Sequence, residues 1–291
     1  MLPKISIILC TYNRDSFLPT MLDSIKNQDY QNYELILIND NSSDSTESII
    51  ESYLASDNRI VYYKNIENKK LPFSRQLAID MAKGQYITFV DDDDYLEKNY
   101  LSFLLNLIEN NDSDIAICAR VDVMSQETVT VSEVKLQNFD RLESIKNLLI
   151  RKPYNANLLA KLFKRDLFKD VRIPIGVLID DIHISYKLYE KSKKVSYANA
   201  PLYYRIIHET NISSFTRNKN EWTPELLREY IDFYLVREKY LLEKAPEIKS
   251  EIEFSTFDFM RNIYSTISTN EKDFEKEIDF IKKTLSTRKL K

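Results

Sequence analysis

Four consecutive aspartates, Asp91 to Asp94, directly follow an apolar run that extends from Tyr86 to Val90. An unbroken apolar run of this length, preceded by Gly84, predicts a strand that is buried on both faces. Adjacent carboxylates repel one another, and that cost is offset when a divalent cation binds among them. Oxygen ligands of this kind suit magnesium, manganese or calcium better than zinc. The alternative is an acidic turn in which one or more of the four caps the next helix.

Polar residues also follow two earlier apolar runs, 5–9 and 35–38. The first run leads into Thr11, Tyr12 and Asn13, and the second leads into Asn39 and Asp40. If these strands are parallel, their carboxyl ends meet at one edge of a sheet, where open α/β folds bind their ligands. A nucleotide would suit such an edge, because Tyr12 could stack on a base and Asp40 could accept a hydrogen bond from a base N–H. A metal held by the aspartates would neutralise a diphosphate.

Strands and helices alternate over the first 120 residues. Strands are expected at 5–9, 35–38, 60–63, 86–90 and 115–118. Apolar residues at helical spacing predict helices within 17–25, 49–54, 77–82 and 101–108. This alternation predicts an α/β fold with a mostly parallel, Rossmann-like sheet and flanking helices.

The pattern loosens beyond residue 119. A strand that leaves the parallel order is expected at 129–134, helices near 145–149 and over 182–191, and a short strand at 195–198. From Trp222 onward the pattern is almost entirely helical, which predicts a helical C-terminal appendage. We therefore expect one domain over 1–215, made of a regular half (1–120) and a less regular half (121–215), and a helical region over 216–291.

Composition excludes several classes of protein. The 291 residues carry 41 basic and 45 acidic side chains, a net charge of −4 that gives no basis for nucleic-acid binding. Only two glycines are present, so the glycine-rich phosphate loops of Rossmann and Walker type are excluded. Cys10 and Cys118 lie in apolar runs and are expected to be core thiols. The absence of a signal peptide and of a long apolar span predicts a cytoplasmic protein, with contact at the inner face of the membrane left open.

Four runs of sequence resemble one family. Residues 5–13, ISIILCTYN, resemble V-S-V-I-I-P-T-Y-N, and residues 27–36, NQDYQNYELI, resemble N-Q-T-Y-x-N-x-E-I-I. Residues 39–44, NDNSSD, resemble D-D-x-S-x-D, and residues 82–94, AKGQYITFVDDDD, resemble A-x-G-x-Y-I-x-F-x-D-x-D-D. In this order and spacing they resemble family 2 glycosyltransferases with the GT-A fold, the inverting type of bacterial polysaccharide and capsule synthesis.

The resemblance implies a nucleotide-sugar donor, usually a UDP-sugar, and a Mn²⁺ or Mg²⁺ ion. It also implies that 1–215 is the catalytic domain, with 1–120 as its nucleotide-sugar half and 121–215 as its acceptor half. Carried over by position, Thr11 and Tyr12 would contact the uridine together with Asn13, and Asp40 would bind the uracil. Within the aspartate run, Asp92 would lie near the ribose, Asp93 would be the principal metal ligand, and Asp91 would support them. Arg75 stands where the family often has an arginine before an A-R-N-x-G helix, although the Asn and Gly are missing here. It would reach the diphosphate, or it is a surface arginine.

The second half carries weaker matches. The pair Asp180 and Asp181 stands where the family has E-D before a helix, and the second acid is the family's base. Asp181 is therefore the expected base, with Asp180 as the other candidate, and either could also cap the helix. Residues 202–205 and 211–213 resemble L-Y-x-Y-R and S-I-S, which makes Arg205 a candidate diphosphate contact and His208 a candidate metal ligand.

The function expected from these residues is metal-dependent transfer of a sugar, with inversion, from a nucleotide donor to a saccharide or lipid-linked saccharide. Two alternatives remain. One is a non-catalytic partner subunit with the same fold. The other is a different phosphate enzyme on an α/β sheet, although such enzymes carry an acid after the first strand and this chain has Cys10 to Asn13 there. A homodimer and a peripheral membrane contact are also left open.

Overall fold

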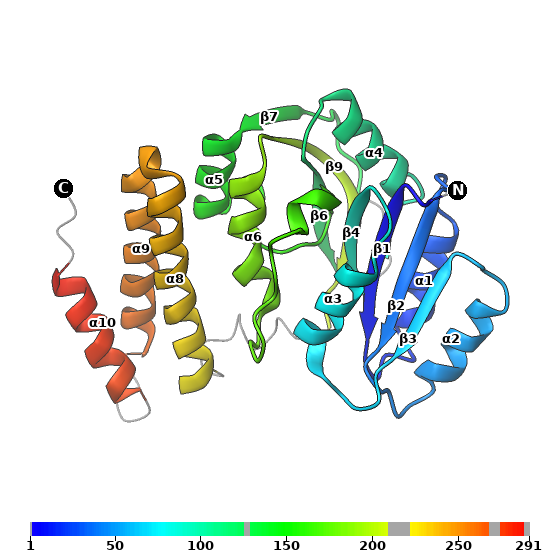
Figure 1. The fold of residues 1–291 in the computed structure, drawn as a ribbon, viewed down its shortest axis with the longest axis horizontal. Helices are drawn as coiled ribbons and strands as arrows, with labels where there is room; N and C mark the ends of the chain where they lie inside the picture. The colour runs from blue at the N-terminus through cyan, green and yellow to red at the C-terminus, as the bar shows by residue number, and fades with distance from the viewer. Residues whose placement is uncertain (1, 125–128, 209–221, 268–273, 288–291) are drawn as a thin grey trace. The chain divides into compact units, whose positions relative to one another are not determined.

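The computed structural model describes residues 2–124, 129–208, 222–267 and 274–287. The chain forms two compact units, one of residues 1–141 with 156–207 and the other of 142–155 with 208–291 (Figure 1). The boundary expected at residue 215 lies outside the described residues, so the proposed division of the chain stays a prediction. The grouping of 142–155 with the C-terminal residues was not expected.

The first unit is built on a sheet of nine strands within the described residues. The strands are β1 (Ile5–Thr11), β2 (Tyr33–Asn39), β3 (Ile60–Lys64), β4 (Tyr86–Asp91), β5 (Tyr95–Leu96), β6 (Ile115–Val123), β7 (Leu136–Asp140), β8 (Lys161–Lys164) and β9 (Lys194–Ile206). Their order is β3-β2-β1-β4-β8-β6-β9-β5, and β7 pairs with β9. Strands β3, β2, β1 and β4 are mutually parallel, and so are β6 and β9, whereas β5, β7 and β8 pair antiparallel to their neighbours.

Helices cover both faces of the parallel strands. The helices of this unit are α1 (Leu18–Lys26), α2 (Thr46–Leu54), α3 (Lys70–Met81), α4 (Tyr100–Asn110) and α6 (Asp180–Lys191), with a 3₁₀ turn at Arg165–Phe168. Helix α3 contacts β1 and β2, and α1 lies on the opposite face (Figure 1). Because both faces are covered, every residue of β2 and all but one residue of β1 are buried. The expected α/β class with a mostly parallel sheet is confirmed.

Three expectations about strands were wrong or incomplete. No strand is present at 129–135, where Val129, Val131 and Val134 are exposed; the strand comes later, as β7, antiparallel to β9. The short strand expected at 195–198 is the beginning of the 13-residue β9. Strands β5 and β8, of two and four residues, were not expected.

Gly84 is required by a close approach between two backbones. A Cβ added there would lie 2.5 Å from the backbone nitrogen of Ser6 and 2.8 Å from the backbone carbon of Ile5. The Gly84 N–H also donates to Ser6 Oγ at 2.8 Å, and Ser6 Oγ donates to Glu34 Oε1 at 2.6 Å. The glycine therefore lets the chain enter β4 directly beside β1.

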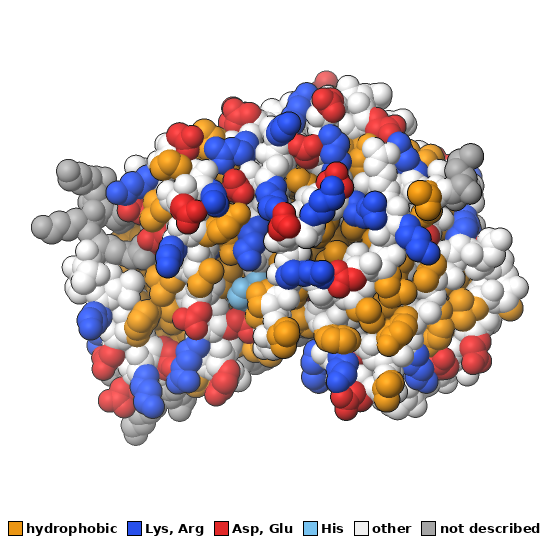
Figure 2. All heavy atoms as spheres, viewed as in Figure 1, with side chains coloured by type: hydrophobic (Ala, Val, Ile, Leu, Met, Phe, Trp, Pro, Cys, Tyr) orange, Lys and Arg blue, Asp and Glu red, His pale blue; other side chains and the backbone are white. Residues whose placement is uncertain are grey.

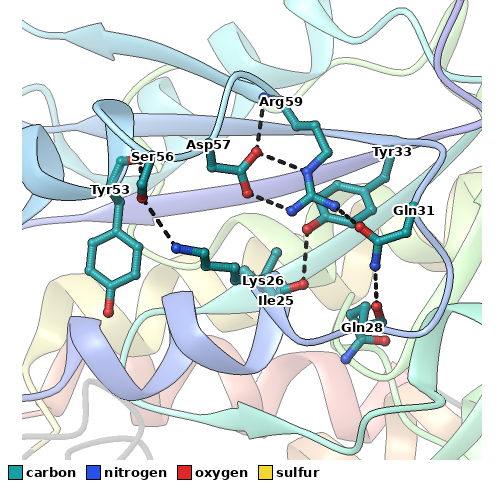
Figure 3. A network of polar contacts seen from close by, with 9 residues as sticks. All are labelled: Ile25, Lys26, Gln28, Gln31, Tyr33, Tyr53, Ser56, Asp57 and Arg59. Carbon is teal, nitrogen blue, oxygen red and sulfur yellow. Dashed lines mark hydrogen bonds and ion pairs between the residues drawn. The ribbon is translucent and has the colours of Figure 1, made fainter.

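A polar network lies at the amino ends of β2 and β3, at the end of the sheet opposite the carboxyl ends of these strands (Figure 3). Arg59 donates to both carboxylate oxygens of Asp57, at 2.8 and 2.6 Å, and its guanidinium lies 4.3 Å from the centroid of the Tyr33 ring. Lys26 Nζ donates to Ser56 Oγ at 3.2 Å. The hollow beside these residues has a volume of about 470 Å³. Because the guanidinium and the carboxylate satisfy each other, we interpret the network as structural.

The second unit is helical. Its helices are α5 (Arg141–Ile150), α8 (Pro224–Lys244), α9 (Lys249–Ile267) and α10 (Glu275–Thr287), with a 3₁₀ turn at Pro246–Ile248. Apolar side chains of α8, α9 and α10, among them Leu227, Met260 and Ile278, form its core. The Tyr234 and Phe259 rings stack with centroids 3.8 Å apart, which joins α8 to α9. The expected C-terminal helices are present, and among the described residues none is both long and apolar enough to cross a bilayer.

Candidate active site

Strand pairing brings the three predicted loops to one edge of the sheet. Cys10 of β1 pairs with Asp91 of β4, and Thr11 of β1 pairs with Asn39 of β2. The N–H of Asp40 donates to the carbonyl oxygen of Thr11 at 2.9 Å. The carboxyl ends of β1, β2 and β4 therefore lie side by side, as parallel strands require.

Three of the four aspartates form an acidic group. Asp91, Asp93 and Asp94 each offer a carboxylate oxygen, and these oxygens lie within 4.8 Å of one another. Burial, opposed by Arg75 and assisted by the charge of Asp93, raises the pKa of Asp91 to about 6. The next helix, α4, has Asn99 at its N-cap, so none of the four aspartates caps it. Closely spaced hard oxygen donors fit a Mg²⁺ or Mn²⁺ ion.

Asp94 is held by strand β9. Its Oδ2 accepts a hydrogen bond from the Tyr203 hydroxyl at 2.7 Å, and its Oδ1 accepts one from the Ile206 N–H at 3.1 Å. The Tyr203 oxygen in turn accepts the N–H of Asp91 at 3.0 Å. Asp94 was expected only as a member of the aspartate run, and its contact with Tyr203 was not predicted, since nothing local marks a partner more than one hundred residues away.

Arg75 joins the acidic group to helix α6. Its guanidinium donates to Asp180 Oδ2 at 2.5 Å and to Asp91 Oδ1 at 3.2 Å. The side chain is buried within α3, so the alternative of a surface arginine is wrong. Its contact with a diphosphate stays a prediction.

The aspartate pair at the start of α6 has two different environments. The helix begins at Asp180, with Ile179 at the N-cap and no capping side-chain hydrogen bond, so neither aspartate is the cap. Asp180 is buried and paired with Arg75. Burial, and next the charge of Asp180, raises the pKa of Asp181 to about 7. A carboxylate that titrates near neutral pH is suited to accept a proton.

The residues expected to bind the nucleotide surround the ends of β1 and β2. Tyr12 is 44% exposed, as a ring available to stack on a base would be. Asn13 has a φ of 51°, which asparagine tolerates, and its side-chain oxygen accepts the N–H of Ser43 at 2.8 Å. Thr11 is buried, and its hydroxyl makes no hydrogen bond within the usual geometric limits, although it is close enough to Asp92 to lower the pKa of that group.

Asp92 is not a member of the acidic group formed by Asp91, Asp93 and Asp94. Its Oδ1 lies 3.5 Å from Nε of Arg14. Burial, and next the charge of Asp93, raises its pKa to about 7. Its contact with the ribose stays a prediction.

Asp40 organises the approach to α3. Its Oδ1 accepts hydrogen bonds from Asn65 Nδ2 at 2.6 Å and from the Lys69 N–H at 2.8 Å, and its Oδ2 accepts the Lys70 N–H at 2.8 Å. A carboxylate has about four acceptor positions, so capacity for a base N–H remains.

The two remaining candidate residues are Arg205, near the end of β9, and His208, just after this strand. Arg205 is paired with Asp122 of β6 at 2.7 Å. His208 lies two residues beyond the end of β9 and outside the acidic group. Its role as a metal ligand stays a prediction, and the second of the two matched runs, 211–213, lies outside the described residues.

Lys161 is a buried lysine that the sequence did not single out. Its Nζ donates to the carbonyl and side-chain oxygens of Asn157, at 2.6 and 2.9 Å, and to the carbonyl of Leu159 at 3.2 Å. Burial, and next the charge of Arg120, lowers the pKa of Lys161 to about 7. The negative charge of Asp181 acts in the opposite direction, which indicates that the two groups influence each other's protonation.

Comparison with known proteins defines the class. A sequence model described as Glycosyl transferase family 2 matches residues 6–172. Glycosyltransferase GlyA of Streptococcus pneumoniae serotype 4 is 30% identical over 238 residues, which are 79% of this chain and 33% of GlyA. Putative glycosyltransferase EpsH of Bacillus subtilis is 27% identical over 283 residues, which are 94% of this chain and 81% of EpsH. The chain thus spans about a third of GlyA and about four-fifths of EpsH.

A solved structure supports the same class at the level of the fold. The crystal structure of S. aureus TarS 1–349 in complex with UDP superposes with a TM-score of 0.69 at 22% identity, over 92% of this chain and 74% of that chain. Fold and site together define a glycosyltransferase of the GT-A class. The family match covers more than half of the residues, and the chain belongs to glycosyl transferase family 2.

Proposed function

We propose that the chain transfers a sugar, with inversion, from a nucleotide-sugar donor to a hydroxyl group of a saccharide or lipid-linked saccharide. One observation carries the proposal. A single buried side chain, Arg75, joins the acidic group at the end of β4 to Asp180 at the start of α6, and Asp180 is the sequence neighbour of the candidate base Asp181. A site for a diphosphate and a base for an attacking hydroxyl would therefore lie at the two ends of one buried bridge.

Asp93 and Asp91 would hold a Mn²⁺ or Mg²⁺ ion, because their oxygens are hard donors that lie close together. A divalent cation bound there would stabilise the negative charge that develops on a departing diphosphate. Asp180 and Arg75 neutralise each other, which leaves Asp181 as the base.

The reaction is a single displacement. Asp181 accepts the proton of the acceptor hydroxyl while the oxygen of that hydroxyl forms a bond to the anomeric carbon. The bond from that carbon to the diphosphate oxygen breaks on the opposite face, and the nucleoside diphosphate leaves with the bonding electron pair. Attack from the face opposite the leaving group inverts the anomeric centre.

Uridine is the nucleoside to test first. Tyr12, which has an exposed ring, follows β1, and Asp40, which has a buried carboxylate, follows the neighbouring strand β2; this combination suits a base that stacks and donates one N–H. TarS, a protein of the same fold, was crystallised with UDP. We also propose a cytoplasmic location, with a peripheral membrane contact and a homodimer as further features to test.

A panel of nucleotide sugars tests this function. We expect uridine-containing sugars to raise the melting temperature of the protein in the presence of MnCl₂ and to have little effect without it, because ligand binding stabilises the folded state. The configuration of the transferred sugar, read by NMR from the product, then reports inversion. If no nucleotide sugar changes the melting temperature at millimolar concentration with either Mn²⁺ or Mg²⁺, the proposed function is wrong.

A further inference from the structure

The hydroxyl group of Tyr203 connects two members of the acidic group. It donates to Asp94 Oδ2 at 2.7 Å and accepts the backbone N–H of Asp91 at 3.0 Å. One oxygen atom on β9 therefore fixes both ends of the four-residue aspartate turn.

Both partners of this contact are fully buried. Tyr203 pairs with Leu96 of β5 on one side and with Arg120 of β6 on the other, so its backbone is held by two neighbouring strands. Its ring packs edge-on against the Tyr100 ring, with centroids 6.1 Å apart. A hydroxyl placed by two strands and a ring contact has little freedom to follow the turn if the turn moves.

Asp94 differs from the other members of the group. Each of its two oxygens already accepts a hydrogen bond from β9, one from Tyr203 and one from the Ile206 N–H. A buried carboxylate needs such donors, because its charge has lost its water. Both of its oxygens are therefore already engaged by strand β9.

We propose that Tyr203 and Asp94 act as one anchor, which positions Asp91 and Asp93 to bind the cation. Tyr203 is a positioning residue, and Asp94 supports the site without coordinating the ion. This inference rests on the metal site of the proposed function. Partners that orient metal ligands typically contribute about 10- to 100-fold to metal affinity.

The first test removes only the hydroxyl group. We expect Tyr203→Phe to raise the Kd for Mn²⁺, measured by electron paramagnetic resonance with UDP present, by about 10- to 100-fold. Tyr100→Phe is the matched control: Tyr100 is equally buried, and its hydroxyl contacts Thr88 Oγ1 at 2.8 Å instead of an aspartate. Its Kd for Mn²⁺ should equal that of the wild type, although both variants lose a buried hydrogen bond and some thermal stability.

A Kd for Tyr203→Phe within twofold of the wild type would overturn the anchor, and so would an equal loss in Tyr100→Phe. These results differ from failure of the proposed function, in which the wild-type protein itself binds no Mn²⁺ with UDP.

The second test separates an anchor from a ligand. If Tyr203 and Asp94 act as a unit, the double variant Tyr203→Phe/Asp94→Asn binds Mn²⁺ no more weakly than the weaker single variant. Additive losses would show that Asp94 acts independently. A crystal structure of the wild type with Mn²⁺ and UDP decides the same point without a variant: the anchor predicts that Asp94 keeps its bond to Tyr203, and an Asp94 oxygen at roughly 2.1 Å from the metal would contradict it.

Discussion

Two adjacent carboxylates at the start of α6 have different environments because Arg75 is paired with only one of them. Its partner is Asp180, and the charge of that aspartate in turn helps to raise the pKa of Asp181. These contacts, which the sequence does not reveal, favour Asp181 as the proposed base.

The pH dependence of turnover follows from the pKa of Asp181, which is about 7. Below this pH the group is protonated and cannot accept a proton, so kcat should fall about tenfold per pH unit. Asp181→Asn should lower kcat by about 10²- to 10⁴-fold and abolish this acid limb, with the Kd for the donor unchanged. Asp166→Asn, at an exposed position, is the control. An acid limb that persists in Asp181→Asn would assign the base elsewhere.

The same group affects stability with a defined sign. Its pKa is raised from 3.8 when the protein folds, so the folded protein retains a proton that the unfolded chain releases between about pH 4 and pH 7. The contribution of Asp181 to the free energy of unfolding is therefore fully present below pH 4, and it is lost progressively as the pH rises from 4 to 7, so the protein becomes less stable over this window. Without metal, Asp181→Asn should unfold with a weaker pH dependence in this window, as measured by urea denaturation.

Arg75 should be important for stability as well as for the site. Arg75→Met leaves Asp91 and Asp180 without their cation in a buried position, and we expect a loss of about 3–5 kcal/mol in the free energy of unfolding. Arg172→Met, which removes an exposed pair with Asp80, should lose about 0–1 kcal/mol. Chemical denaturation at pH 7 compares the two, and similar losses would mean that the Arg75 bridge is not maintained in solution.

At the scale of elements, local pattern predicted the first half of the sheet well. The runs at 5–9, 35–38 and 86–90 are β1, β2 and β4, because strands covered on both faces have continuous apolar sequences. Short or one-sided strands lack this signal. The two- and four-residue strands β5 and β8 form because neighbouring strands pair with them. The alternating valines near 129–134 are exposed and lie before the actual strand, β7, which begins at Leu136.

The residue types of the site and the sheet edge that they share could be predicted, but the side-chain contacts between them could not. The aspartate run and the Asp180–Asp181 pair were identified from composition and from family resemblance. The contacts that organise them, from Arg75 to Asp180 and from Tyr203 to Asp94, join residues more than one hundred positions apart, and no local pattern encodes such pairs. Lys161 was missed because its burial depends on the pairing of β8 with β4 and β6, which was not expected either.

Gly84 provides a test of the packing between β1 and β4. Gly84→Ala places a methyl group 2.5 Å from a backbone nitrogen, where no flexible side chain can yield. We expect a loss of about 1–3 kcal/mol from the resulting overpacking, measured by thermal or chemical unfolding. Gly176→Ala is not a matched control, because that glycine has a φ of 80°. Ser6→Ala instead separates the lost hydrogen bond from the steric effect, and an unchanged stability of Gly84→Ala would refute the close approach.

At the scale of the whole chain, one unit carries the described site and the other is a helical assembly with its own core. Residues 142–155 group with the C-terminal helices although they precede most of the acceptor half in sequence. The family match ends at residue 172 and therefore does not explain the helical unit. On the face drawn in Figure 2, the coloured basic and acidic side chains are interspersed, in agreement with the small net charge.

Calorimetric titration of UDP into the protein with and without Mn²⁺ tests the central claim most directly. The wild type should bind UDP at least about tenfold more tightly with Mn²⁺, because carboxylates that repel a diphosphate attract it once a divalent cation lies between them. Asp93→Ala should lose this dependence on Mn²⁺ while it keeps its fold. Equal affinity for UDP with and without the metal in the wild-type protein would contradict the account.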